Sequence, residues 1–240
     1  MIKITTAAAA VFAASVALAG CTPTTEQAST GTAPATPTAM TGSPAPAPGD
    51  GQGEASEAAT DAPEVGANLN QYIVDNKIAE VPFKKDEPGT PTISFPLPTD
   101  WRPAGDRTPE WAYGAIVYDK AKDSNDPPYM YAIASKLTGN VDANKVLDLA
   151  PGQLDELPGF KPVNGAPQRV KFAGYDAISY VGTYEWEGKS RSVGQETVVI
   201  PGKDGLFVLQ LNGESTAGQE QVVIDAGDAI RAKTTITLPS

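Results

Sequence analysis

A long tract near the N-terminus, residues 22–65, confines any folded structure to the rest of the chain. Of its 44 residues, 34 are Ala, Thr, Pro, Gly or Ser, and none is aromatic. It carries six acidic residues and no Lys or Arg. Such a tract cannot bury enough apolar surface to offset the entropy that it would lose on ordering. We therefore expect a disordered tether over residues 21–65 and one globular domain over residues 66–240.

The segment before the tether has the pattern of a secretory signal peptide. Lys3 supplies a positive charge, and residues 7–20 form a run that is apolar apart from Ser15. This run is shorter than the ~20 residues that a membrane-spanning helix needs. It ends in Leu-Ala-Gly-Cys at residues 18–21, which matches the bacterial lipobox, where the Cys thiol accepts a diacylglycerol. The alternative is an ordinary signal peptide with an accidental cysteine.

Cys21 is the only cysteine of the chain, and it lies at the register that the lipobox requires. We therefore predict a signal peptide over residues 1–20 and lipidation, with palmitate-type acyl chains, at Cys21. Two or more acyl chains anchor a protein stably, because one chain alone binds a membrane only marginally. The expected location is the outer face of the cell membrane, with the membrane itself as a partner through the lipid anchor.

The charge and the composition exclude several classes of function. The chain has 18 Lys plus Arg against 29 Asp plus Glu, so its net charge is −11, which disfavours a nucleic-acid partner. It contains no histidine, so His-assisted catalytic triads and His-containing metal sites are excluded. One cysteine cannot form an internal disulfide or a Cys-rich zinc site. We therefore predict a non-enzyme with no catalytic residue, no metal and no cofactor.

The hydrophobic pattern of residues 66–240 predicts helices and strands in a mixed order. Expected helices are 68–76, one capped by Asp142, a short turn around Leu154 and Leu157, and one from Ser215 or Thr216 to about Ala232. Expected strands are 92–101, which Pro96 and Pro98 close, 113–119, 129–137, 168–172, 176–187, 189–200 and 205–211. Gly-containing turns separate the last four, so neighbouring strands should pair antiparallel. The predicted fold class is α+β, an antiparallel sheet flanked by helices.

Alternating aromatic residues in the strand 176–187 suggest a binding face. Tyr180, Tyr184 and Trp186 share one side of the strand with Ile178, and Gly182 leaves a gap between them. One interpretation is an apolar trough, in which the rings contact an acyl chain and the Tyr hydroxyls meet a sugar head group. The other is that this face packs under a helix as core. Both interpretations place Gly182 where a ligand or a helix comes close.

Two further motifs have simpler explanations. The stretch "GTYEWEGKS" at residues 182–190 is similar to a phosphate-binding loop, but five residues separate its glycines and a strand follows it. We expect a hairpin turn at Glu187-Gly188 instead. The stretch "DKAKDSND" offers Asp119, Asp123 and Asp126 but lacks the Gly and the closing Glu of a calcium loop. A solvated turn is the expected structure there.

Several stretches, taken together in order, resemble the LpqN family of mycobacterial lipoproteins. They are the lipobox, the Thr/Pro tether, "YIVDNKI", "PGTPTISFPLPTDW", "SNDPPYMYAIASKLTGN", "VLDLAPGQLDELPGF" and "ETVVIPGKDGLFVLQLN". The resemblance implies a Mog1/PsbP-like domain, which is an α/β/α sandwich. It also implies a role beside the cell-envelope lipid machinery, with MmpL-type transporters and trehalose-linked mycolate lipids as partners. Cys21, as the lipidation site, is the one residue to which the resemblance assigns a specific role.

Two functions of different classes follow from the sequence. The first is a tethered accessory protein that binds or transfers an envelope lipid without catalysis. The second is a protein-interaction adaptor that docks to an envelope transporter or another partner and has no ligand of its own. A large apolar cavity would favour the first, and a filled core with an exposed flat patch would favour the second.

The lipobox generates a direct test. Replacing Cys21 with Ser removes the thiol that accepts the diacylglycerol, so the variant should lose all labelling by a fatty-acid analogue. Its signal peptide should also stay uncleaved by the lipoprotein peptidase. Metabolic labelling followed by electrophoresis measures both effects. Labelling of the Cys21→Ser protein at the level of the unaltered protein would contradict the assignment.

Overall fold

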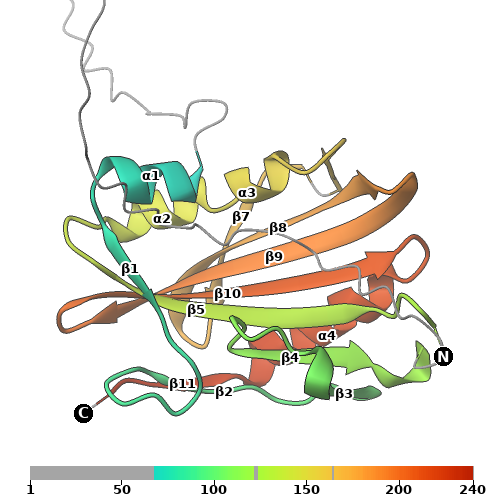
Figure 1. Ribbon diagram of the computed structural model, residues 1–240, viewed down its shortest axis with the longest axis horizontal. Helices are drawn as coiled ribbons and strands as arrows, with labels where there is room; N and C mark the ends of the chain where they lie inside the picture. The colour runs from blue at the N-terminus through green and yellow to red at the C-terminus, as the bar shows by residue number, and fades with distance from the viewer. Residues whose placement is uncertain (1–67, 122–123, 164, 240) are drawn as a thin grey trace, which may run out of the picture. The chain divides into compact units, whose positions relative to one another are not determined.

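A large antiparallel sheet organises the computed structural model, which describes residues 68–121, 124–163 and 165–239. Its strand order is β3-β4-β5-β10-β9-β8-β6, with β1 paired to β5 and β7 paired to β8 (Figure 1). The bounds are β1 Ala79–Pro82, β3 Trp101–Pro103, β4 Gly114–Tyr118, β5 Tyr129–Thr138, β6 Lys161–Pro162, β7 Gln168–Phe172, β8 Tyr175–Trp186, β9 Lys189–Gly202 and β10 Gly205–Thr216. A separate two-stranded sheet joins β2 (Thr92–Ser94) to β11 (Thr235–Thr237). The predicted α+β class is thus confirmed.

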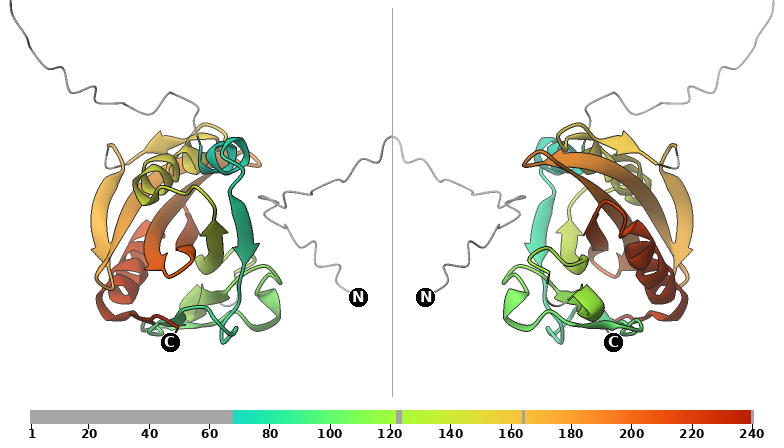
Figure 2. Two further views of the ribbon diagram at one scale, coloured as in Figure 1. Left: turned by 90° about the vertical axis from the view of Figure 1, so that its left-hand side faces the viewer. Right: turned by 90° about the vertical axis from the view of Figure 1, so that its right-hand side faces the viewer.

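The α-helices lie on two sides of the large sheet. They are α1 (Leu69–Asp75), α2 (Ala143–Leu149), α3 (Gly152–Asp155) and α4 (Glu220–Lys233), with 3₁₀ turns at Gly105–Arg107 and Asp119–Ala121. Figures 1 and 2 show α1, α2 and α3 close together and α4 apart from them, across the strands. Leu69 of α1 and Leu147 of α2 pack on one face of β8, β9 and β10, whereas Ile230 of α4 belongs to the cluster on the other face.

The side chains of the central strands alternate between these two faces. In β10, Leu206 and Val208 join the cluster under α1 and α2, whereas Phe207 and Leu209 join the cluster on the α4 side. The alternation of Phe207, Leu209 and Leu211 along the sequence predicts an apolar core face, which is confirmed. The strand is, however, buried on both faces, because helices cover both.

Local signals located several elements correctly. Asn68 begins α1 by accepting a hydrogen bond from the Gln71 N–H at 2.9 Å. Asp142 begins α2, since its Oδ1 accepts from the Asn144 N–H at 2.7 Å. The turn at Glu187 and Gly188 has φ of 51° and 71°, and it joins β8 to β9 with Trp186 opposite Lys189. Positive φ at both central residues is typical of a two-residue hairpin, so the predicted turn is confirmed.

The expected start of the last helix was wrong, and the first expected strand is shorter than its stretch. Ser215 and Thr216 do not begin the last helix, because they pair with Ser192 and Arg191 of β9 as the end of β10. The helix begins after Gln219 instead. The strand expected at 92–101, closed by Pro96 and Pro98, ends before these prolines as β2, and a separate strand, β3, begins at Trp101. β2 pairs with β11 outside the large sheet. Prolines between them break the run, because proline cannot donate a backbone hydrogen bond to a sheet.

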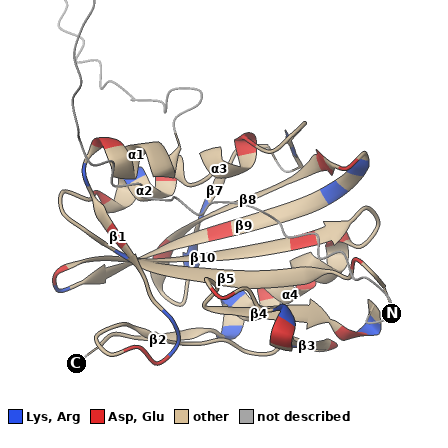
Figure 3. Ribbon diagram, viewed as in Figure 1, with Lys and Arg blue, Asp and Glu red and all other residues tan. Residues whose placement is uncertain are grey.

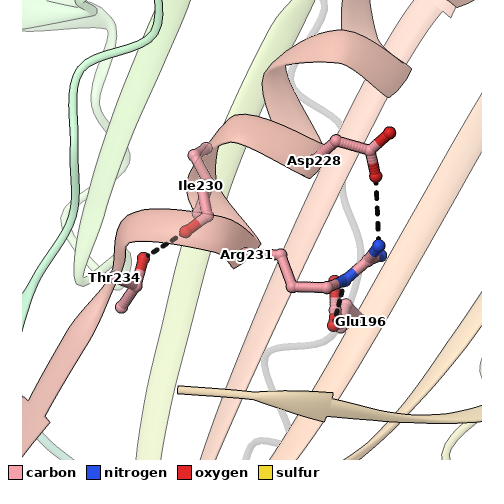
Figure 4. Close-up of polar contacts among 5 residues, drawn as sticks. All are labelled: Glu196, Asp228, Ile230, Arg231 and Thr234. Atoms are coloured by element: carbon pink, nitrogen blue, oxygen red, sulfur yellow. Dashed lines mark hydrogen bonds and ion pairs between the residues drawn. The ribbon is translucent and has the colours of Figure 1, made fainter.

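An ion pair fastens α4 to the large sheet. The Arg231 guanidinium donates from Nε to both carboxylate oxygens of Glu196 in β9, at 2.9 and 3.1 Å, and from Nη2 to Oε2 at 3.0 Å. It also donates to Asp228, one turn earlier in α4, at 3.0 Å (Figure 4). Glu196 is only 7% exposed. Its charge therefore depends on Arg231 for compensation.

Removal of this guanidinium should destabilise the domain. Arg231→Ala leaves the buried Glu196 carboxylate without its charged partner, and we expect a loss of about 1.5–3 kcal/mol in the free energy of unfolding. Lys233→Ala, at an exposed position of the same helix, should cost less than about 0.5 kcal/mol. Urea unfolding at neutral pH measures both values. Equal losses for the two variants would mean that the ion pair contributes nothing.

Candidate functional site

The aromatic face of β8 lies under α3. Tyr180 and Tyr184 are 8% and 6% exposed, and they form a buried cluster with Leu154 and Val193. The Tyr180 hydroxyl donates to Asp155 of α3 at 3.0 Å. Burial, with this carboxylate beside it, raises the pKa of Tyr180 to about 12, so the hydroxyl stays a neutral donor. These contacts match the interpretation of the face as core.

Phe160 fills the gap that Gly182 leaves on this face. A Cβ at Gly182 would collide with the Phe160 ring, and the rings of Phe160 and Tyr180 lie 5.2 Å apart between centroids. The space that the sequence offered to a ligand is therefore occupied by the chain itself. Trp186 differs from the two tyrosines, because it lies at the end of β8 and is 40% exposed. A ligand role for Tyr180, Tyr184 and Trp186 stays a prediction, and the contacts of the tyrosines do not favour it.

Tyr184 also belongs to a partly buried polar cluster. Its hydroxyl donates to Glu214 Oε2 at 3.1 Å, and the Arg191 Nη2 lies 3.6 Å from the same oxygen. Arg191 forms a second ion pair with Asp126. Burial raises the pKa of the Glu214 carboxyl, while Arg191 opposes the rise. Each of these charged groups has a partner within the cluster, so the cluster holds the neighbouring strands together and offers no free group to a ligand.

A cavity opens on the opposite face of the sheet, beneath α4. Its volume is about 350 Å³, which falls at the lower end of the range for small-molecule sites. The wall is formed by β7, β8, β9 and β10, the roof by α4, and most of the lining is apolar. The apolar lining includes Val163, Val170, Val181, Leu211, Val223 and Ile224. In β8, Ser179 and Val181 line the cavity, and they alternate along the strand with the aromatic residues of the other face.

Glycines determine how α4 meets the strands. At Gly213 of β10 an added Cβ would lie 2.5 Å from the Val223 Cγ1, so the absent side chain lets the helix approach closely. At Gly227 of α4, which lines the cavity, an added Cβ would meet nothing within 4 Å. The helix is thus in close contact with the sheet at Gly213, whereas space remains open at Gly227, and the cavity lies there.

Polar side chains interrupt the apolar lining. Ser192, Ser215 and Glu220 line the cavity where α4 begins, and Glu196, Asp228 and Arg231 line it farther along the helix. The Ser192 hydroxyl donates to Glu220 at 3.2 Å. The cavity therefore suits an amphipathic molecule, whose apolar part would follow the valines and whose polar part would meet these groups.

A second cavity of about 340 Å³ lies between the large sheet and β2. Ile93, Tyr113 and Ile230 are among its lining residues. Met130 and Leu211 line both cavities, so these two side chains stand between them. Met130 is an adaptable side chain at this point, because its unbranched thioether changes rotamer easily.

The acidic stretch at residues 119–126 forms ion pairs. Asp119 pairs with Arg102 at 2.9 Å and Asp126 with Arg191, so these two carboxylates of the 119–126 stretch are engaged by guanidinium groups. Asp123 and Cys21 lie outside the described residues.

Acidic and basic residues are interspersed over the described elements (Figure 3). Within the described ranges, no helix is long and apolar enough to span a bilayer.

Comparison with known proteins places the chain among lipoproteins. The model of a family described as "Probable lipoprotein LpqN" matches residues 65–237. The Lipoprotein LpqN of Mycobacterium tuberculosis is 47% identical over 236 residues, which cover 97% of this chain and 98% of that protein. A crystal structure of LpqN from the same organism, described as involved in cell envelope biogenesis, aligns with a TM-score of 0.66 at 44% identity. It covers 71% of this chain and 97% of the crystallised one.

The two ends of the aromatic face should respond differently to truncation. Tyr180→Ala removes a ring from a packed cluster, and we expect a cost of about 3–5 kcal/mol in the free energy of unfolding, as for other large aromatic deletions. Trp186→Ala, at an exposed position, should cost about 1 kcal/mol or less. Chemical unfolding followed by circular dichroism measures both. A large loss for Trp186→Ala would place that ring in the core after all.

Proposed function

The chain belongs to the LpqN family of lipoproteins, and from this premise we propose that its domain binds an envelope lipid in the cavity beneath α4, without catalysis. The protein would then act as a membrane-anchored accessory in the binding or transport of cell-envelope lipids. The single observation that carries the proposal is an apolar cavity with polar groups at its margin, on the face opposite α1, α2 and α3. This combination is what an amphipathic ligand requires.

The volume of the cavity limits what it can hold. At about 350 Å³ it accommodates a segment of a hydrocarbon chain or a head group, and the remainder of a long lipid would lie outside. A half-enclosed lipid suits transfer, because the exposed part remains accessible to the next binder. We propose trehalose-linked mycolate lipids as the ligand class and an MmpL-type transporter as the partner in transfer; both come from the family resemblance.

A non-catalytic role is supported by how the carboxylates of the cavity are held. Glu196 and Asp228 both bind Arg231, and Glu220 accepts hydrogen bonds from Ser192 and from the Gly218 N–H at 2.9 Å. An acid–base pair for hydrolysis needs one carboxyl group whose pKa is raised, so that it can donate a proton, whereas backbone N–H groups lower the pKa of the Glu220 carboxyl. In this cavity the carboxylates serve the contacts between α4 and the strands instead.

The remaining parts of the proposal concern fold type and attachment. We propose that the domain is of the Mog1/PsbP-like α/β/α type, since α1–α3 and α4 cover opposite faces of one sheet. The acylated Cys21 would hold it at the outer face of the cell membrane, and residues 22–65 would give it access to lipids and to transport proteins.

An adaptor role is the second candidate, and the exposure of Trp186 favours it. An exposed aromatic ring at the end of a hairpin can anchor a protein partner. One variant, Trp186→Ala, distinguishes the lipid-binding role from the adaptor role. Trp186→Ala should leave lipid binding unchanged if the cavity is the site, and it should weaken capture of the transporter if the hairpin is the docking surface.

Filling the cavity provides the main test. Gly227→Leu places a side chain into the open space beneath α4. A bound ligand would then have to share that space with the leucine, and overpacking of this kind costs about 1–3 kcal/mol. We therefore expect the affinity for dodecyl maltoside to fall about tenfold or more. Calorimetric titration of the mature chain carrying Cys21→Ser measures the affinity. The protein should stay folded, since helix propensity improves by about 0.5 kcal/mol or more when Gly is replaced.

The matched control is Ala232→Leu, which adds the same side chain at an exposed position of α4. Its affinity for dodecyl maltoside should equal that of the unaltered protein. If Gly227→Leu binds as well as the control does, the cavity is not the binding site.

A further inference from the structure

The second cavity, between the large sheet and β2, differs from the cavity beneath α4 in the chemistry of its lining. Beneath α4, carboxylates and hydroxyls line the wall, and the Ser215 Oγ has no hydrogen-bond partner within the described residues. In the second cavity the charged lining residue is Lys85, which is exposed, as are Thr92 and Ser94. The Tyr113 hydroxyl already lies against the backbone of β2. The interior of the second cavity is therefore apolar and suits hydrocarbon alone.

Both cavities lie along one row of residues that crosses the strands on the α4 side of the sheet. From β8 to β4, this row consists of Val181, Gly194, Gly213, Met130 and Ile116, each opposite the next. The first three line the cavity beneath α4, Ile116 lines the second cavity, and Met130 lines both. Opposite residues of antiparallel strands are about 4.5–5.5 Å apart, so the row is a direct path between the cavities.

Met130 separates the two cavities and is suited to move. Its side chain lies over Gly213, because its Cγ and Cε are 3.4 and 3.5 Å from the position of a Cβ added there. The residue is 6% exposed, and its unbranched thioether changes rotamer easily. Leu211, the other residue that lines both cavities, lies diagonally across β10 from it. Rotation of the Met130 side chain would therefore widen the passage beside Leu211.

Small residues keep the second cavity open. Gly114 of β4 lies opposite Ala132 of β5, and both line this cavity. A Cβ added at Gly114 would meet nothing within 4 Å. Ile230 of α4 also lines the second cavity, so the helix that covers the first cavity reaches the second as well. A chain that passes Met130 would thus remain in apolar surroundings.

We propose that the second cavity receives the distal part of a hydrocarbon chain whose first part lies beneath α4, and that Met130 determines which chain lengths the domain accepts. The two volumes are about 350 and 340 Å³, so the second cavity nearly doubles the space for a chain. The ligand class is therefore a long alkyl chain. This assignment rests on the proposed lipid-binding function and adds to it a second site and a basis for chain-length selection.

Decyl and hexadecyl maltoside, which have 10 and 16 carbons in their chains, provide the test. Each buried methylene should strengthen binding about fourfold, since its burial contributes about 0.8 kcal/mol. The unaltered protein should therefore bind hexadecyl maltoside about 100-fold or more tightly than decyl maltoside. Gly114→Val fills the second cavity, so the affinity for hexadecyl maltoside should fall about tenfold or more, while that for decyl maltoside stays the same. The variant should stay folded, because valine suits a strand better than glycine does.

Titration of the mature chain carrying Cys21→Ser, with each maltoside below its micellar concentration, gives the ratio of the hexadecyl to the decyl affinity. The matched control is Ala79→Val, which introduces the same side chain at an exposed position of β1 that lines neither cavity, and its ratio should equal that of the unaltered protein. Met130→Ala should raise the ratio about threefold or more, because a long chain then passes without displacing the thioether. A methionine that only packs the core would lower the melting temperature and leave the ratio unchanged.

The outcomes distinguish the second site from the function on which it rests. Equal ratios for Gly114→Val and Ala79→Val, or an unchanged ratio for Met130→Ala, overturn the second site and its selection of chain length, while lipid binding beneath α4 stands. If the unaltered protein binds neither maltoside, the proposed function fails, and the second site fails with it.

Discussion

The pairing of β9 with β10 is the interaction on which the rest of the domain depends. The register continues without a break from Gly205 opposite Gly202 to Thr216 opposite Arg191. Because side chains alternate along each strand, this ladder divides the residues between two faces, and each face recruits its own helices. Helices α1, α2 and α3 pack on one side, and α4 with the cavity lies on the other. A slip of one residue in this ladder would exchange the two faces.

The cavity exists at some cost to stability. A glycine within a helix costs about 0.8–1 kcal/mol relative to alanine, and an alanine would fit at Gly227 without a clash. The buried, unpaired hydroxyl of Ser215 costs about 1–3 kcal/mol more. Both unfavourable features lie on the same cavity, whereas the clusters on the opposite face are closely packed. Departures from the most stable choice often mark the part of a fold that is used.

Local sequence signals predicted the elements whose structure is decided locally. Asn68 and Asp142 begin helices, and Glu187-Gly188 forms a hairpin, because each depends on a few adjacent residues. The start of α4 was missed because Ser215 and Thr216 suit a helix cap and a strand equally, and their pairing with distant β9 decided the outcome. The cavity was missed for the same reason. Ser179 and Val181 attract no notice beside the aromatic residues, and only Gly227, inside a helix, was a signal.

Under the proposed function, binding in the cavity would couple the survival of the folded protein to the supply of its lipid. A ligand that binds only the folded state stabilises that state by RT ln(1 + [L]/Kd), which is about 2.7 kcal/mol when the free ligand is at one hundred times Kd. Proteases remove unfolded chains, so changes of 1–2 kcal/mol alter steady-state abundance severalfold. Copies that carry lipid would outlast empty ones, and the amount of this protein would follow the amount of lipid available to it.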